Sequence, residues 1–189
     1  MPTTTEQATT LQTYHIDPSH SRLGFTVRHL GFSKVRGSFE QFEGVVRMQP
    51  GDLSTLEAEG TVQTQSVTTS DAKRDAHLRS ADFFEVETYP TITFKSTDVR
   101  DVSSDSFTLV GEFTMHGVTK TIELDGEFLG EGADPWGGTR VAFEARTKLN
   151  RKEYGLNWNA VLESGDVLVS DSVEITLEVQ AVLADASED

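Results

Sequence analysis

The amino-acid sequence predicts an all-β protein of one domain, with antiparallel strands arranged as a sandwich or a barrel. Apolar and polar residues alternate through most of the chain from Arg22 onward, turn signals separate the alternating runs, and one stretch near the middle has helical spacing instead. Alternation with a period of two is typical of strands with one buried and one solvated face. About eight such strands in one domain form either a sandwich or a barrel.

The strands follow one another along the chain, beginning with RLGFTVRH, where Leu23, Phe25 and Val27 share one face. Later runs repeat this spacing. The other large apolar residues that we expect to face the interior are Phe94, Leu109, Phe113, Ile122, Leu124, Phe128, Phe143, Ile175 and Leu177. Between two of the runs, His116-Gly117 favours a two-residue hairpin turn, because the second central position of such turns prefers glycine.

Small residues recur between the large ones on the apolar faces, as at Gly60, Gly111, Gly126 and Ala145. One interpretation is tight packing, in which the small residues make room for phenylalanine rings. The other is a cavity, because a barrel of about eight strands can be filled by side chains or can hold one small ligand. The pattern leaves both open.

The stretch with helical spacing is SVTTSDAKRDAHLRSADFF. Thr68 and Asp71 have the spacing of a capping box, and Arg74, Leu78 and Ala81 then recur at helical intervals. This predicts a short helical segment that caps one end of the sheet.

A second irregular stretch, LNRKEYGLNWNAVLESGDVLVSD, contains Arg151, Tyr154 and Trp158. Amphipathic aromatic residues in a loop beside strands can line the mouth of a cavity. They can equally cover the open end of a barrel, and both interpretations stand.

Charge and composition exclude several classes of function. The chain has 189 residues, 31 acidic and 16 basic, with a formal net charge of −15, which disfavours binding to nucleic acids. It has no cysteine, so thiolate nucleophiles and thiolate metal sites are excluded. No apolar run approaches the roughly 18 residues of a membrane-spanning helix, so we expect no stable membrane insertion.

The termini are expected to flank one folded domain. Residues 1–13 are predicted to form a flexible polar lead, 14–183 the barrel, and 184–189 an acidic tail. The lead lacks the basic start and apolar core of a secretory signal, so a cytoplasmic location is expected.

The histidines do not form a recognisable catalytic or metal-binding pattern. His15, His20, His29, His77 and His116 lack the spacing of a zinc-protease motif, and no nucleophile elbow or phosphate-binding glycine loop occurs. We therefore expect no enzyme activity, no metal and no cofactor. A histidine-dependent enzyme that uses His29 or His116 is the less favoured alternative. His29 is predicted to have a hydrogen-bonded structural role, with contact to the end of a ligand as the alternative.

Four stretches together resemble the YceI-like family of polyisoprenoid-binding proteins, whose barrel is lipocalin-like. They are IDPSHSRLGFTVRHLGFSKVRGSFEQFEG, RDAHLRSADFFEVETYPTITFKS, GEFTMHGVTKTIEL and RKEYGLNWNAVLESGDVLVSDSVEITLEVQAV. The resemblance runs from about Tyr14 to Val182. Each stretch alone is weak, but four in order across one domain are specific.

The resemblance implies an eight-stranded antiparallel barrel whose apolar pore binds an isoprenoid lipid noncovalently and without catalysis. The ligand would be a polyprenyl compound or an isoprenoid quinone, with a fatty-acid-type amphiphile as the alternative. Many relatives are secreted to the periplasm behind a signal peptide, from which this sequence departs. A homodimer formed by edge pairing stays open, because edge exposure depends on whether the barrel closes.

A ligand that carries phosphate would need a cation at the mouth, for which Arg74 and Arg151 are candidates. The competing interpretation of both arginines is a surface salt bridge. His29, Tyr154 and Trp158 are the other candidates for polar contacts with a head group.

Overall fold

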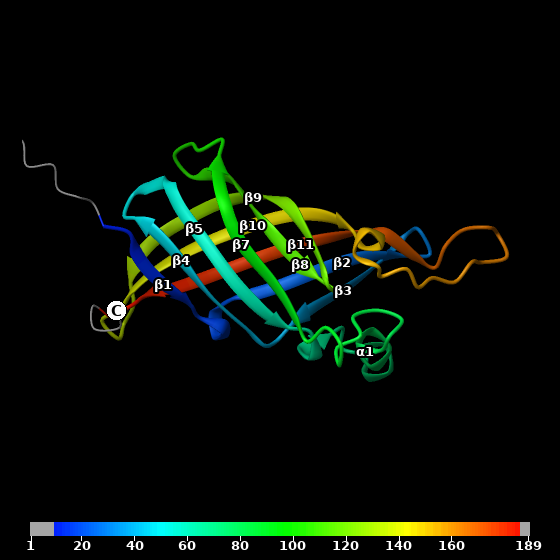
Figure 1. The fold of residues 1–189 in the computed structure, drawn as a ribbon. Coiled ribbons are helices and arrows are strands. Elements are labelled where there is room, and N and C mark those ends of the chain that lie inside the picture. The colour runs from blue at the N-terminus through cyan, green and yellow to red at the C-terminus, as the bar shows by residue number, and fades with distance from the viewer. Residues whose placement is uncertain (1–9, 186–189) are drawn as a thin grey trace, which may run out of the picture.

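The computed structural model describes residues 10–185, which form a closed eight-stranded antiparallel β-barrel with one short helix at one end (Figure 1). The predicted fold class is thereby confirmed, with the barrel rather than the sandwich. The predicted lead and tail lie largely in residues 1–9 and 186–189, outside the described residues, and the first strand begins at Gln12.

The first two barrel strands are each broken into two pieces. β1 (Gln12–Ile16) and β2 (Arg22–His29) form one, separated by the 3₁₀ turn η1 (Pro18–His20), and β3 (Ser33–Phe39) and β4 (Phe42–Gln49) form the next. The remaining six are β5 (Asp52–Gln63), β7 (Thr91–Arg100), β8 (Ser106–Met115), β9 (Val118–Ala133), β10 (Thr139–Asn150) and β11 (Val169–Leu183).

The last strand closes the barrel. β11 pairs with β10 along one edge, and along the other it pairs with β2 at Ile175↔Phe25 and with β1 at Ala181↔Ile16. β1 in turn pairs with β4, so the ring is complete. Because each strand lies beside its neighbour in sequence, local hairpins determine most of the register.

The small residues on the inner face make room for aromatic rings. Phe25 lies directly opposite Gly37, and Phe107 directly opposite Gly126. A Cβ atom at either glycine would lie 2.3 Å from the opposing ring. The packing interpretation of the small residues is thus correct at these two places.

The predicted hairpin at His116-Gly117 is confirmed. Met115 and Val118 pair across it, and the two central residues have φ angles of 52° and 74°. These positive values are those of the primed turn that suits the twist of a hairpin.

The predicted helix is present as α1 (Ala72–Arg79), beside the two-residue strand β6 (Val67–Thr68). The capping prediction was wrong in its register: Asp71 is the N-cap and accepts a hydrogen bond from the Arg74 backbone N–H at 2.9 Å. Thr68 and Asp71 are both residue types that favour the N-cap position, so their spacing alone does not show which of them begins the helix.

One hydrophobic cluster of buried residues includes Tyr14 and Met48, and a second includes Val67, Leu149 and Tyr154. Around Tyr14, Met48, Val141 and Ala181, which are almost completely buried, the interior is solid, and we call this region the packed end. At the opposite end, where α1 lies (Figure 1), the strands border a cavity of about 370 Å³. We call this region the hollow end.

Candidate functional site

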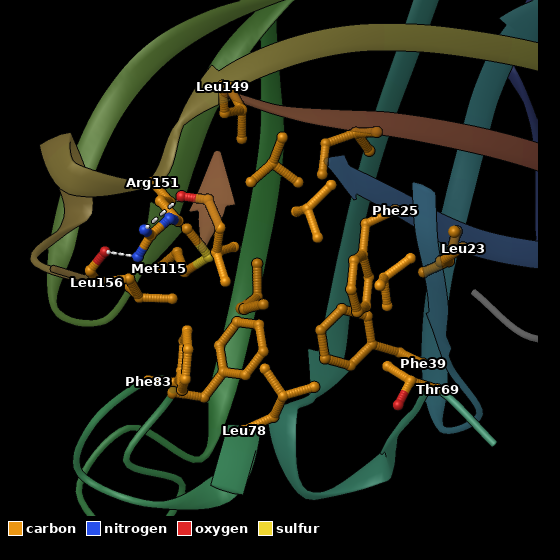
Figure 2. A pocket seen from close by; sticks show the side chains of 18 of the residues that line it. Leu23, Phe25, Phe39, Thr69, Leu78, Phe83, Met115, Leu149, Arg151 and Leu156 are labelled. Carbon is orange, nitrogen blue, oxygen red and sulfur yellow. Dashed lines mark hydrogen bonds between the residues drawn. The ribbon is translucent and has the colours of Figure 1, made fainter. Parts of the chain in front are cut away.

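The hollow end contains a cavity of about 370 Å³ between the barrel strands and α1. In Figure 2, Phe25 and Phe39 of β2 and β3 lie across it from Leu156, and Leu78 of α1 closes its lower side. Most of the lining side chains are apolar, and those contributed by the strands occupy inward positions. The cavity thus presents hydrocarbon surface to whatever enters it.

A second cavity of about 180 Å³ continues toward the packed end. The two cavities are adjacent, since they share a set of seven lining residues: Leu23, Val62, Ile92, Phe113, Leu149, Ile175 and Leu177. The space inside the barrel therefore suits an elongated apolar molecule better than a compact polar one.

The structure brings the predicted interior residues together. Eleven of the twelve line one or both cavities, namely Leu23, Phe25, Val27, Phe94, Leu109, Phe113, Ile122, Leu124, Phe143, Ile175 and Leu177. Phe128 lies outside both linings, because its ring packs against that of Phe143, with centroids 5.2 Å apart. That these residues contact a ligand stays a prediction.

The mouth of the larger cavity has a polar rim. Exposed Arg74 belongs to the lining, and its Nε–H donates to Thr69 Oγ1 at 2.7 Å while an Nη2–H donates to the Thr69 carbonyl at 3.0 Å. Thr69 is held in turn by the buried carboxylate of Asp75, which accepts from its N–H at 2.8 Å and from its hydroxyl at 2.5 Å. This network fastens α1 and Arg74 to the barrel edge.

The His29 ring lines the same cavity, but the prediction of a hydrogen-bonded structural role was wrong. Within residues 10–185 its ring nitrogens have no hydrogen-bond partner, and only its backbone carbonyl accepts, from Ser33 Oγ at 3.0 Å. The ring lies at the end of the inward row of β2, where Ser33 of β3 is its direct cross-strand neighbour.

Arg151 forms the predicted ion pair, with Asp171 at 3.8 Å, but its own side chain is buried rather than at the surface. It begins η3 (Arg151–Tyr154) and is only 3% exposed. Its guanidinium donates to the carbonyls of Leu156 (2.7 Å), Trp158 (2.8 Å), Ser170 (2.9 Å) and Val169 (3.4 Å). Burial lowers the pKa of this guanidinium. Because the carbonyls take its donors, Arg151 holds the segment that follows η3 against the barrel.

Tyr154 also has a structural position. It is buried outside both cavity linings, its ring packs edge-on against Phe113 at 5.5 Å, and burial raises the pKa of its phenol. The Tyr154 carbonyl accepts a hydrogen bond from His116 Nδ1 at 2.9 Å. Tyr154 thus lies outside both cavities, whereas Arg151 lines the larger one with its donors directed at backbone carbonyls.

Trp158 does lie at the mouth, in an aromatic cluster that the sequence did not predict. The centroid of its ring lies 4.7 Å from that of His77 in α1 and 5.4 Å from that of Phe83, and all three residues line the larger cavity. His77 Nε2 lies 2.8 Å from Asp82 Oδ2. The cluster joins α1 to the segment after η3 and so closes the barrel end between them.

Other lining residues were missed although the sequence contained a signal for them. Val35 and Phe39 continue the spacing of Leu23, Phe25 and Val27 across the β2–β3 hairpin and face the same cavity. Extending the alternation through the turn would have found them.

Among residues 10–185, no group of three or more histidine or acidic side chains could hold a metal ion. Within the same residues, no helix has the length and apolarity needed to cross a membrane.

Comparison with known proteins relates the barrel to others. Residues 14–181 match the YceI-like domain. The chain is 40% identical over 138 residues to a UPF0312 protein of Vibrio cholerae, covering 73% of each chain.

Two solved structures share the fold. BcnA of Burkholderia cenocepacia superimposes with a TM-score of 0.77 at 19% identity, covering 88% of this chain and 99% of BcnA. A polyisoprenoid binding domain from Saccharophagus degradans, implicated in plant cell wall breakdown, gives 0.67 at 18% identity, covering 92% and 99%. The matched range includes every residue that lines the two cavities and nearly all of the barrel, and the chain belongs to the YceI-like family.

Proposed function

We propose that the protein binds one long-chain isoprenoid lipid noncovalently inside the barrel and carries or stores it without chemical change. The observation that carries the proposal is the pair of adjoining apolar cavities of about 370 and 180 Å³. Together they lie within the roughly 300–1,000 Å³ of typical small-molecule sites. The description of the Saccharophagus degradans domain as polyisoprenoid binding supports the same ligand class.

The binding energy would come from burial of the chain. One isoprene unit of about five carbons, at about 0.8 kcal/mol per methylene, favours binding by about 3–4 kcal/mol. Several units would exceed the practical affinity limit near −18 kcal/mol, so most of this gain must be offset. Lost chain entropy and the favourable environment of the lipid in its membrane supply that offset.

The polar end of the ligand would lie at the mouth, beside His29 and Arg74. Arg74 has an Nη1 group that donates to no described residue, and the His29 ring has no partner among residues 10–185. A phosphate or a quinone oxygen could accept from either side chain. This makes an isoprenoid with an acceptor at its head a better fit than a plain hydrocarbon.

Catalysis has little support from the geometry. His77 and Asp82 form the one histidine–carboxylate hydrogen bond at the cavity lining among the described residues, and it faces aromatic rings rather than a nucleophile. A catalytic histidine needs a group to activate and a place for developing charge. We therefore propose a binding protein.

The test combines extraction with titration. Freshly purified protein should release an isoprenoid on solvent extraction and show the matching mass shift in native mass spectrometry. In a Trp136→Phe background Trp158 is the sole tryptophan, and an isoprenoid quinone should quench its fluorescence with saturation. Palmitate tests the fatty-acid alternative: saturable uptake of palmitate in preference to the quinone would contradict an isoprenoid ligand.

A variant that fills the larger cavity tests the site directly, and a substitution at the surface is its control. Val27 and Val173 face each other across β2 and β11 in the larger cavity, and Val27→Phe with Val173→Phe should weaken quinone binding at least tenfold, by about 1.4 kcal/mol or more. Leu129→Phe changes an exposed residue of β9 and should leave binding unchanged. An apo mass with no quinone or palmitate uptake would reject the proposal.

A further inference from the structure

Three large apolar side chains face solvent at the hollow end of the barrel. Phe32 is 76% exposed in the turn between β2 and β3, and Val161 and Val167 are 76% and 43% exposed in the hairpin that precedes β11. Val161 and Val167 pair with each other across that hairpin. We call these three residues the apolar tip.

The two loops of the apolar tip are joined to each other. The backbone N–H of Leu30 donates to the carbonyl of Leu168 at 3.0 Å, which ties the β2–β3 turn to the hairpin next to Val167. In Figure 1 both loops project from the same end of the barrel, beyond the last turns of the strands. Exposed apolar side chains that gather on one surface, rather than scatter singly, can mark an interaction site.

The apolar tip adjoins the cavity mouth. His29, three residues before Phe32, and Leu168, one residue after Val167, both line the larger cavity. Trp158, three residues before Val161, also belongs to the cavity lining. Whatever binds the tip is therefore brought to the opening through which a ligand would pass.

Basic residues flank the apolar tip in a protein of net charge −15. Arg28 and Lys34 face each other on the outer side of β2 and β3, and Arg36 follows on the same face. All three are exposed, and none forms an ion pair with another residue in the range 10–185. The hairpin carries two carboxylates, Glu163 and Asp166, which are fewer than the three cations of β2 and β3.

We propose that the apolar tip docks on an anionic lipid bilayer and places the cavity mouth against the membrane surface. Phe32, Val161 and Val167 would enter the interface, and the three cations of β2 and β3 would contact acidic head groups. The purpose of docking rests on the proposed function: a lipid that moves directly between bilayer and barrel avoids exposing its chain to water. The docking itself can be measured whether or not the cavity binds an isoprenoid.

Vesicle sedimentation tests the proposal. Wild-type protein should bind vesicles of phosphatidylcholine and phosphatidylglycerol in equal parts, and binding should weaken with added salt because the cations are exposed. Phe32→Ser should lower binding about tenfold, as loss of one inserted ring requires. Lys34→Glu with Arg36→Glu should lower it about tenfold or more on these vesicles and leave the weaker binding to phosphatidylcholine alone unchanged.

Trp136 provides the matched control, because it is 77% exposed in the β9–β10 loop, far from the cavity lining. Trp136→Ser should bind vesicles like wild type, and Phe32→Ser should still take up quinone in solution. Binding that Phe32→Ser and Trp136→Ser lower equally, or no vesicle binding at all, would overturn the proposal. So would a wild-type dimer in solution that Phe32→Ser makes monomeric, because the tip would then contact a second copy.

Vesicle binding by a protein that takes up no quinone would reject the proposed function and leave docking intact. Quinone uptake by a protein that binds no vesicles would reject docking and leave the proposed function intact. The two proposals therefore fail in distinguishable ways.

Discussion

The packed end and the hollow end of the barrel consist of the same alternating strands but differ in what lies between them. At the packed end, Tyr14, Met48 and Val141 are buried almost completely. At the hollow end, Phe25 and Val27 face inward from β2 and are only half-buried, because they border the larger cavity. Alternation decides the direction of a side chain, whereas the contents of the barrel depend on how far apart the walls stand.

The breaks in the first two strands explain why the ends differ. β1 pairs with both β4 and β11, so the packed end is closed by strands on all sides. After the break at η1, β2 continues with β3, and β3 pairs further only at Ser38 and Phe39 with β6. The hollow end is therefore completed by α1 and by the segment that Arg151 holds, and neither fills the interior as a strand does.

The largest expected difference between the ends concerns their aromatic residues. Tyr14→Ala should lower the free energy of unfolding by about 3–5 kcal/mol, because it leaves a hole in solid packing. Phe25→Ala should lower it by about 1–2 kcal/mol, because the ring already borders empty space and less apolar surface is lost. Urea unfolding followed by circular dichroism measures both values.

Tyr14→Phe is the control at the packed end. It keeps the ring and removes only the hydroxyl that donates to Gln12 at 2.8 Å, so it should cost far less than Tyr14→Ala. If Tyr14→Ala and Phe25→Ala lower the free energy of unfolding equally, the hollow end is packed in solution. The two ends of the barrel would then not differ as the cavity indicates.

The sequence predicted the direction of the interior residues well, but it could not predict the rim. Leu177 and Phe113 were found from alternation because burial on one face leaves a period of two. The burial of Arg151 and Tyr154 was not predicted, because nothing in their spacing indicates that the arginine will meet carbonyls both of the segment just after it and of the start of β11. His29 was assigned a partner because an ionisable ring in an apolar row usually has one.

Two glycines sharpen the comparison further. At Gly44 an added Cβ would lie 2.6 Å from the Glu59 carbonyl oxygen, a backbone atom that cannot move without the strand. At Gly37 it would meet only the ring of Phe25, which can turn into the cavity. Gly44→Ala should therefore cost about 1–3 kcal/mol of stability, and Gly37→Ala less than about 1 kcal/mol.

Ligand uptake separates the two glycine variants in the opposite order. Gly37→Ala should weaken quinone binding, because the displaced ring of Phe25 occupies part of the larger cavity, whereas the folded fraction of Gly44→Ala should bind like wild type. If Gly37→Ala leaves the quinone affinity unchanged, the ring of Phe25 does not turn into the larger cavity. The side chains of the hollow end would then be less free to move than the empty space beside them indicates.

The smallest expected effect is electrostatic and concerns the junction of β1 and β2. Asp17 accepts hydrogen bonds from Ser19, from Arg140 at 2.7 Å and from His20, and these hold the pKa of its carboxyl well below its usual value. Arg140 also donates to Asp134 at 3.1 Å, which links this junction to the β9–β10 loop.

A carboxyl whose pKa is lowered by folding stabilises the protein above the pKa of the unfolded chain, and this stability is lost as the pH falls through the range between the two pKa values. Asp17→Asn should therefore reduce stability at neutral pH and flatten its decline between about pH 5 and about pH 2. Glu163→Gln, at an exposed carboxylate of the hollow end with no ion pair among residues 10–185, should leave that slope as it is. If Asp17→Asn keeps the full acid slope, other carboxylates fasten the strands, and the break between β1 and β2 is not held by Arg140.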